Sequence, residues 1–158
     1  EKSQMCRRDR ANAWFGKDKL SVIERFINNL MRTGKFSGKK QHCAKAFEAA
    51  LDNIAERTGE NPLQHFINAI VASAPCEEIT RIKFGAVSQP KAVDSSPSRR
   101  LDTALRNLSK GCASATAKST RTLTQGIISE INKAAAGDVS SYAVAKKEEL
   151  ERIAASSR

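Results

Sequence analysis

The sequence predicts a mainly α-helical protein, a single six-helix domain with a projecting two-stranded β-hairpin arm and a basic N-terminal extension. Most of the chain after residue 17 repeats apolar residues at intervals of three and four, which is typical of amphipathic helices. Residues 76–94 break this period and place β-branched residues around a central Gly85, a pattern that favours a hairpin. The 158 residues are the usual length of one domain. We therefore expect a basic arm over 1–17 and a helical domain over 18–158.

The first two helices are expected on either side of a Gly- and Lys-rich loop. The first runs from about residue 18 to 32, with Asp18 as its N-cap. The second begins at Ser37 or Lys39 and ends near residue 57. The loop between them is not a phosphate-binding Walker loop, because no strand precedes it and no Lys-Ser or Lys-Thr pair follows its glycines.

The third helix is expected to open at Asn61-Pro62, because an N-cap followed by proline is a common helix start, and to end at Pro75. It is apolar almost all round, which predicts a central position. The hairpin follows, with strands near 77–83 and 87–94. A two-stranded ribbon alone is marginal in water, so we expect this arm to lie on a partner.

The last three helices follow from similar signals. Ser96-Pro97 opens the fourth, and the small, polar residues 112–120 are expected to form a link. The fifth helix continues to a glycine stop at Gly137, and Ser140 or Ser141 opens the sixth. In the sixth helix, Lys147 and Glu151 have the spacing of an ion pair.

The charge of the chain points to a polyanionic partner. Lys and Arg number 27 against 17 Asp and Glu, which gives a net charge of +10. The excess is concentrated in residues 1–40 and 79–121, each with a net charge of +7, and an acidic stretch separates them. If the fold brings both blocks to one face, they form a continuous basic surface. The alternative is two solvated basic patches with no common ligand.

The candidate RNA-binding residues are the cations of these two blocks, whose side chains are able to neutralise phosphates. They are Arg7, Arg8 and Arg10 in the arm, Lys35, Lys39 and Lys40 in the loop, Arg81, Lys83 and Lys91 in the hairpin, and Arg99, Arg100, Arg106, Lys118 and Arg121 beyond it. Two alternatives for Arg99 and Arg100 are ordinary surface charges and a salt bridge to Asp94 or Asp102. The acidic face of the second helix, with Glu48, Asp52 and Glu56, is expected to face solvent or a protein neighbour.

Other chemistry has little support in the sequence. The two histidines have no second ligand pair at zinc spacing, and Ser, Cys and Lys form no nucleophile motif, so we expect no enzyme, no metal and no cofactor. Trp14 is interpreted as an anchor into the domain core. The four cysteines are expected to be free thiols, since a basic chain without a secretory signal usually works in a reducing compartment. The longest apolar stretch, residues 66–74, is too short to span a membrane.

Several stretches resemble the small-subunit ribosomal protein seven family, in its eukaryotic and archaeal form, whose eukaryotic member is numbered five. They are ERFINNLMRTGKFSGKK, TGENPLQHFINAI, the KAVDSSPSRR that closes the hairpin, and SYAVAKKEELERIAASSR. They occur in the family's order, and the resemblance covers about residue 15 to the end.

The resemblance implies six helices with a hairpin arm, and a structural role in the head of the small ribosomal subunit. It implies binding to the 3′ major domain of the small-subunit ribosomal RNA, with the hairpin near the exit-site tRNA and the emerging messenger. It further implies a contact between the C-terminal helix and the platform protein numbered eleven, no homo-oligomer, and a cytoplasmic location in the ribosome, with a nucleolar stage during assembly in a eukaryote. The alternative from another class is a free-standing nucleic-acid-binding module, such as an RNA chaperone or regulatory protein.

Overall fold

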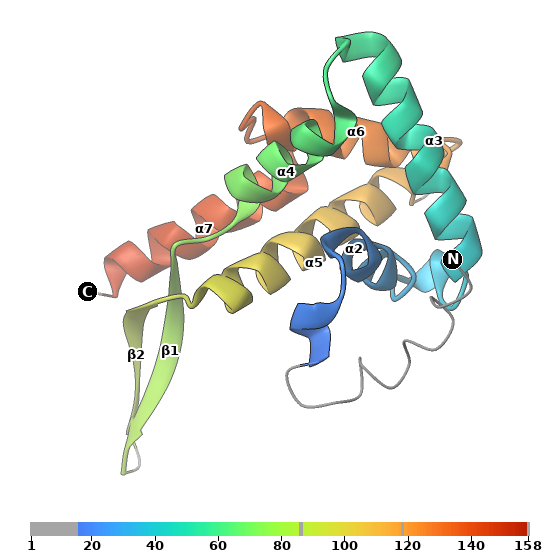
Figure 1. The fold of residues 1–158 in the computed structure, drawn as a ribbon. Helices are drawn as coiled ribbons and strands as arrows, with labels where there is room; N and C mark the ends of the chain where they lie inside the picture. Colours follow the sequence, from blue (N-terminus) through green and yellow to red (C-terminus); the bar gives the residue numbers. More distant parts are fainter. Residues whose placement is uncertain (1–15, 86, 118, 158) are drawn as a thin grey trace.

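The computed structural model describes residues 16–85, 87–117 and 119–157. Within these ranges it confirms six α-helices and one antiparallel hairpin (Figure 1). The helices are α2 (Val22–Leu30), α3 (Lys40–Thr58), α4 (Pro62–Ser73), α5 (Pro97–Thr116), α6 (Leu123–Ala135) and α7 (Tyr142–Ser156). The strands β1 (Glu77–Phe84) and β2 (Val87–Asp94) lie between α4 and α5, and short 3₁₀ turns, η2 (Gly16–Lys19) and η3 (Gly34–Phe36), flank α2. None of the helices in these ranges is long and apolar enough to cross a lipid bilayer.

The start of the first helix differs from the sequence expectation. Asp18 lies in the η2 turn and does not cap a helix. The N-cap is Ser21, whose hydroxyl oxygen accepts a hydrogen bond from the backbone N–H of Glu24 at 3.2 Å. A Ser at this position satisfies one of the free N–H groups of the first turn as well as an Asp does, so both sites are plausible from sequence. The helix also ends at Leu30, two residues before the predicted end.

The caps of the later helices agree with the sequence. Gly59 adopts a left-handed conformation, with φ of 67°, and ends α3. Asn61 caps α4 by accepting a hydrogen bond from the backbone N–H of Leu63, and Pro62 is the first helical residue. Ser141, one of the two predicted candidates, caps α7.

The link predicted over residues 112–120 is largely helical, since α5 continues to Thr116. Cys112 and Thr116 extend the buried stripe of Leu108 at four-residue spacing, and both are at most 2% exposed. The small residues permit close packing, because a Cβ on Gly126 of α6 would stand 2.8 Å from the carbonyl oxygen of Cys112. The abundance of small polar residues therefore marks a tight contact of α5 with α6 in this region.

The core is centred on three phenylalanines from successive helices, Phe26, Phe47 and Phe66. Their ring centroids are 5.1 to 5.3 Å apart with tilted or edge-on geometry, and none is more than 2% exposed. Helix α6 packs against α3, α4, α5 and α7, so it is the central helix. Helix α4, which was expected to be central because it is apolar almost all round, packs against α3, α5, α6 and α7. Its apolar residues Ile67 and Val71 nevertheless remain 49% and 66% exposed.

The hairpin projects away from the helices at one end of the molecule (Figure 1). Its register runs from the pair Glu77 and Asp94 at the root to Phe84 and Val87 at the tip, within one residue of the predicted strands. Most of β2 is exposed. The arm contacts the helices at its base through α7. The contacts with α7 therefore hold the root of the hairpin, and its outer part remains accessible.

Candidate nucleic-acid interface

The loop of residues 33–40, which contains η3 and is called the η3 loop below, is anchored by a buried aromatic residue and exposes its lysines to solvent. Phe36 is buried at 6% exposure, and its ring stacks on that of His42 with centroids 6.1 Å apart. This anchoring of the loop leaves Lys35 and Lys39 exposed. Lys40 is also exposed, but its Nζ lies 3.2 Å from Oε1 of Glu24 on α2. Of the three predicted lysines, Lys40 is held by this ion pair. Lys35 and Lys39 form no salt bridge with the described residues and are thus more accessible to phosphates.

The arm carries exposed cations on both of its faces. Arg81 and Lys83 are two residues apart on β1, so they share one face of the ribbon. Lys91 stands opposite Thr80 in the register and so belongs to the other face, because directly opposed residues lie on the same side of a sheet. All three side chains are exposed, and within the described residues they have no salt-bridge partner. A polyanion in contact with this arm would meet a positive charge on either side.

Arg99 and Arg100 lie at the root of the arm, where they contact the protein itself. The Nε of Arg99 donates to Oε2 of Glu78 at 2.6 Å, although the Arg99 side chain remains 65% exposed. The Nε of Arg100 donates to the carbonyl oxygen of Pro75 at 3.0 Å, and its Nη2 lies 3.5 Å from the Sγ of Cys76. The salt-bridge alternative thus holds for Arg99, with Glu78 rather than Asp94 or Asp102 as its partner.

Helix α7 completes this root. Lys147 Nζ donates to the carbonyl oxygen of Ala72 at 3.0 Å. Glu151 accepts a hydrogen bond from the backbone N–H of Cys76, also at 3.0 Å. These two residues, predicted to pair with each other, instead hold the end of α4 and the entry to β1. The direction in which the arm leaves the body is therefore fixed by α5 on one side and α7 on the other.

Asp102, in the second turn of α5, forms ion pairs with cations from the first basic block. Arg25 Nη2 donates to its Oδ1 at 2.5 Å, and Lys17 pairs with its Oδ2. Partial burial tends to raise the pKa of Asp102, but the hydrogen bonds and charges of Lys17 and Arg25 outweigh it, and the pKa is lowered. Part of the first block therefore reaches the start of α5, near the arm.

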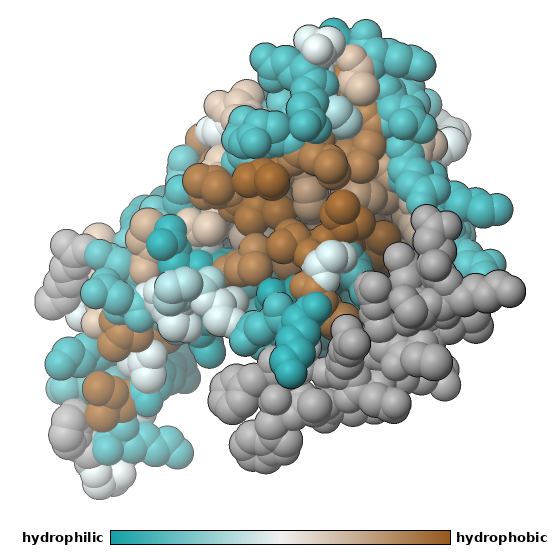
Figure 2. All heavy atoms as spheres, viewed as in Figure 1, coloured by the Kyte–Doolittle hydropathy of each residue, from teal (hydrophilic) through white to brown (hydrophobic). Residues whose placement is uncertain are grey.

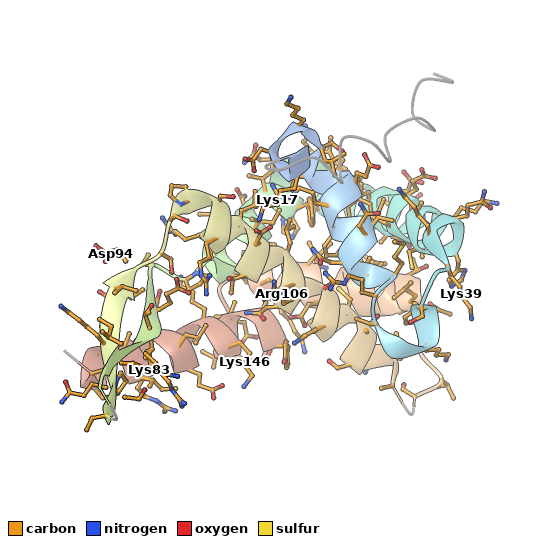
Figure 3. The ribbon with its side chains drawn as sticks, turned by 90° about the horizontal axis from the view of Figure 1, so that it is seen from below. Lys17, Lys39, Lys83, Asp94, Arg106 and Lys146 are labelled. Atoms are coloured by element: carbon orange, nitrogen blue, oxygen red, sulfur yellow. The ribbon has the colours of Figure 1, made fainter. Side chains whose placement is uncertain are left out.

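Lys39, the N-cap residue of α3, does not converge on that junction. Figure 3 shows Lys83 on the arm at one side of the molecule, Lys39 at the other side and Arg106 of α5 between them. The 20 residues of α5 span about 30 Å at about 1.5 Å per residue. The two predicted basic blocks thus form an extended line of charge and not one compact patch.

The second basic block has further exposed cations. Arg106 is exposed on α5, and Arg121 is exposed just before α6. Lys110, which the sequence analysis did not select, is exposed one turn beyond Arg106. Its i,i+4 spacing from Arg106 is the signal that identifies it. Of the remaining predicted contacts, Arg7, Arg8, Arg10 and Lys118 lie outside the described residues, as does Trp14.

Helix α3 carries an exposed acidic face. Glu48, Asp52 and Glu56 are all exposed, as expected for a face turned to solvent or to a protein neighbour. Because a phosphate backbone is repelled by carboxylates, this face is unsuited to RNA. The basic surface is therefore defined both by its cations and by the absence of these three carboxylates.

Of the histidines and cysteines that the structure describes, Cys43 and Cys112 belong to the buried core, and His65 links two helices. The Nε2 of His65 lies 3.1 Å from Oδ1 of Asn132, which joins α4 to α6. Cys43, Cys76 and Cys112 are free thiols, as predicted, whereas Cys6 is outside the described residues. Burial raises the pKa of Cys43 and, more strongly, that of Cys112, so both thiols stay protonated at neutral pH.

Comparisons with known proteins agree on one family. Residues 2–158 match the family described as ribosomal protein S7p/S5e. The chain is 50% identical over 143 residues to the small ribosomal subunit protein uS7 of Thermoplasma volcanium, an alignment covering 90% of this chain and 78% of that protein. It is 45% identical over 148 residues to the protein of the same name from Archaeoglobus fulgidus, with coverage of 94% and 76%. The similarity thus includes the arm, the η3 loop and α5, where the candidate contacts lie.

Proposed function

The chain belongs to the ribosomal protein S7p/S5e family, and from this premise we propose that it binds and organises the 3′ major (head) domain of the small-subunit ribosomal RNA. As a member of this family, it is a structural protein of the small ribosomal subunit. The family is not a class of enzymes. The observation that carries the proposal is the line of exposed cations from the arm across α5 to η3.

The mechanism is electrostatic positioning of a folded RNA. Exposed lysines such as Lys35 and Lys39 neutralise phosphates and release the ions condensed on them, which drives binding. The deep major groove of an RNA helix excludes side chains, so such a protein reads the spacing of the backbone and loops instead of base sequence. The candidate cations are spread over a distance longer than helix α5. They therefore suit an RNA in which several structural elements are contacted at once.

The arm and α7 have separate roles in this proposal. The arm, with Arg81, Lys83 and Lys91, extends toward the exit-site tRNA and the emerging messenger. The C-terminal part of α7 meets the platform protein numbered eleven. Support for the first role comes from the exposure of both faces of the arm, and for the second from the exposed Ile153, at 42%, near the end of α7. The protein acts in the cytoplasmic ribosome and, in a eukaryotic cell, joins the RNA in the nucleolus.

A footprint on naked small-subunit ribosomal RNA tests the proposal directly. Hydroxyl-radical protection is expected at clustered sites within the 3′ major domain, and the triple variant Lys35→Ala, Lys39→Ala, Lys40→Ala is expected to lose part of it. Co-sedimentation with small subunits at high salt provides the second measurement. A protein that protects RNA without preference for this domain, and leaves the subunits at high salt, would support the free-standing module instead.

A further inference from the structure

Helix α7, which holds the root of the arm, has little apolar contact of its own with the body. Of its 15 residues, all of which the structure describes, three are buried, and none of them is larger than valine: Ala143, Val144 and Ala154. In Figure 2, hydrophobic side chains gather over α4 and its neighbours, whereas the side from which the arm leaves is mostly hydrophilic. Apolar burial stabilises in proportion to the area removed from water, so small side chains contribute little. The direction of α7 therefore depends in large part on polar contacts.

A buried carboxyl group makes the polar contact at the start of α7. Glu130 of α6 is 6% exposed, and its Oε1 accepts hydrogen bonds from the hydroxyl of Ser141 at 2.8 Å and from the backbone N–H of Ala143 at 3.1 Å. It forms no ion pair with the residues that the structure describes. A buried carboxyl group is costly unless hydrogen bonds satisfy it, and the N–H groups at a helix start favour a carboxylate. The two hydrogen bonds thus fasten the start of α7 to α6.

Helix α5 also restricts the position of this carboxyl group. A Cβ on Gly111 of α5 would stand 2.4 Å from Oε1 of Glu130, so an alanine there would displace the carboxyl group from α7. The same helix α5 carries Arg100, which donates to the carbonyl oxygen of Pro75 at the root of the arm. The two helices that hold this root, α5 and α7, therefore meet at the side chain of Glu130.

The later part of α7 links this position to the arm. The helix runs from the end of α6 to the side of the molecule where the arm leaves the body (Figure 1). Lys147 donates to the carbonyl oxygen of Ala72 at 3.0 Å. Glu151 accepts from the backbone N–H of Cys76, also at 3.0 Å. From Ala143 to Glu151 the helix rises about 12 Å, at about 1.5 Å per residue. A change of direction at its start therefore displaces both side chains from the backbone that leads into β1.

We propose that Glu130 is a positioning residue for the RNA-binding arm, which it does not itself touch. It sets the direction of α7, and α7 in turn sets the direction in which β1 and β2 leave the body. The consequence for RNA rests on the function proposed above, whereas the effect on the arm is a property of the free protein. Because Arg100 still holds Pro75 from the side of α5, loss of the Glu130 contacts is expected to tilt the arm and not to release it.

Residual dipolar couplings of the backbone N–H groups, measured by NMR on the full chain without RNA, report the direction of the arm relative to the helices. Glu130→Met removes both acceptor oxygens and keeps an unbranched side chain of similar length. The couplings of β1 and β2 should then no longer fit the orientation shared by α3, α4 and α6, and the N–H of Cys76 should exchange with solvent several-fold faster. Glu130→Gln keeps an acceptor oxygen and should restore both measurements toward the native values. Native couplings and exchange in Glu130→Met would overturn the proposal, even if its unfolding midpoint fell.

The matched control, Asn132→Leu, removes another polar contact from the same helix. The Oδ1 of Asn132 lies 3.1 Å from Nε2 of His65 on α4 and makes no hydrogen bond to α7. This variant should lower stability without turning the arm, and an equal change in its couplings would contradict a specific role for Glu130. If Glu130→Met does not fold, Ser141→Ala, which removes one of the two donors, is measured instead with the same deciding outcomes.

Affinity for small-subunit ribosomal RNA separates this inference from the proposed function. Substitutions that act through a network of contacts change binding by about 2- to 30-fold, and Glu130→Met is expected to weaken RNA binding within this range. A turned arm with weaker binding supports both. A turned arm with unchanged affinity supports the positioning role of Glu130 and contradicts the role of the arm in RNA binding. An arm in its native direction overturns the positioning role whatever the affinity.

Discussion

The body and the arm of this protein are stabilised in opposite ways. In the body, the rings of Phe26, Phe47 and Phe66 contact one another and exclude water. In the arm, most of β2 is exposed, and within the described residues the two strands pair only with each other. A hairpin of this kind is marginal by itself in water. The arm therefore depends on the contacts at its root for its direction.

The cations at the root of the arm and those farther out also differ in their contacts. At the root, Arg99 and Arg100 are bonded within the protein, and Lys147 and Glu151 secure the adjoining backbone. Farther out, exposed cations such as Lys83 have no such partner among the described residues. Arginine and lysine side chains thus serve two purposes in this protein. Those near the body set the position of the arm, and those beyond it are available to a polyanion.

The largest effect is expected from opening the aromatic cluster of the body. Phe47→Ala should destabilise the fold by about 3–5 kcal/mol, because it removes a fully buried ring and leaves a cavity between two others. Urea unfolding followed by circular dichroism measures this loss. Val87→Ala, at a 61% exposed position near the tip of the arm, is the control and should change stability by no more than about 0.5 kcal/mol. Equal losses in both variants would remove the distinction between body and arm.

The second prediction concerns affinity instead of stability. Replacing Arg81, Lys83 and Lys91 together by Ala should leave the unfolding midpoint nearly unchanged. Each phosphate contact contributes about 0.9 to the slope of log affinity against log salt, so the slope for the cognate RNA should fall by up to about three. The unmodified chain should itself lose about 10³–10⁵ in affinity between about 50 and 200 mM salt if six to ten phosphates are contacted.

The control for this triple variant removes two cations from the acidic helix. Lys45 and Arg57 are exposed on α3, on the same helix as Glu48 and Asp52. Lys45→Ala with Arg57→Ala lowers the net charge without touching the proposed surface. The fall in the slope of log affinity against log salt is compared for each charge removed. If this fall is as large as in the arm variant, total charge governs binding and the position of the charges does not.

Local signals in the sequence predicted those parts of the fold that local interactions determine. The Asn61-Pro62 start of α4 and the strands on either side of Gly85 depend on neighbours a few residues away, and both agree with the structure. The end of α5 does not depend on such neighbours. Residues 112–116 are helical because they pack closely against α6, which a composition of small polar residues does not reveal.

The candidate site shows the same limit. Exposure of the loop and arm lysines followed from their positions outside the apolar stripes. The partner of Arg99 did not, because Glu78 is 21 residues away along the chain and reaches it only through the register of the hairpin root. The partly exposed charge network at Asp102 likewise joins residues 77 and 85 positions apart. Long-range pairs of this kind require the fold before they can be identified.

The third prediction distinguishes the two arginines at the root. Arg100→Ala should cost about 1–3 kcal/mol of stability, because it leaves the carbonyl oxygen of the buried Pro75 without its charged donor. Arg99→Ala should cost at most about 1 kcal/mol, since its ion pair with Glu78 is largely solvent-exposed. Arg99→Ala should nevertheless weaken RNA binding, because the exposed guanidinium can also hold a phosphate. Measuring unfolding and RNA affinity on both single variants gives the comparison, and identical profiles would contradict it.

The smallest effect is expected where the first basic block meets the body, at Asp102. Its pKa is lowered in the folded protein by the hydrogen bonds and charges of Lys17 and Arg25, which outweigh the opposing effect of burial. A carboxyl whose pKa falls on folding stabilises the fold at pH values above its ordinary pKa of 3.8, and this contribution is lost as the pH falls through the folded value. Asp102→Asn keeps an oxygen acceptor for Arg25 and removes only the charge, so it should cost about 1 kcal/mol at pH 7. Once the pH falls below the lowered pKa of the folded protein, the native Asp102 also becomes neutral, and the difference between the two proteins should shrink. Urea midpoints of both proteins at pH 7 and at progressively lower pH measure this, and a difference that stays constant would show that the two cations do not depend on the charge of Asp102.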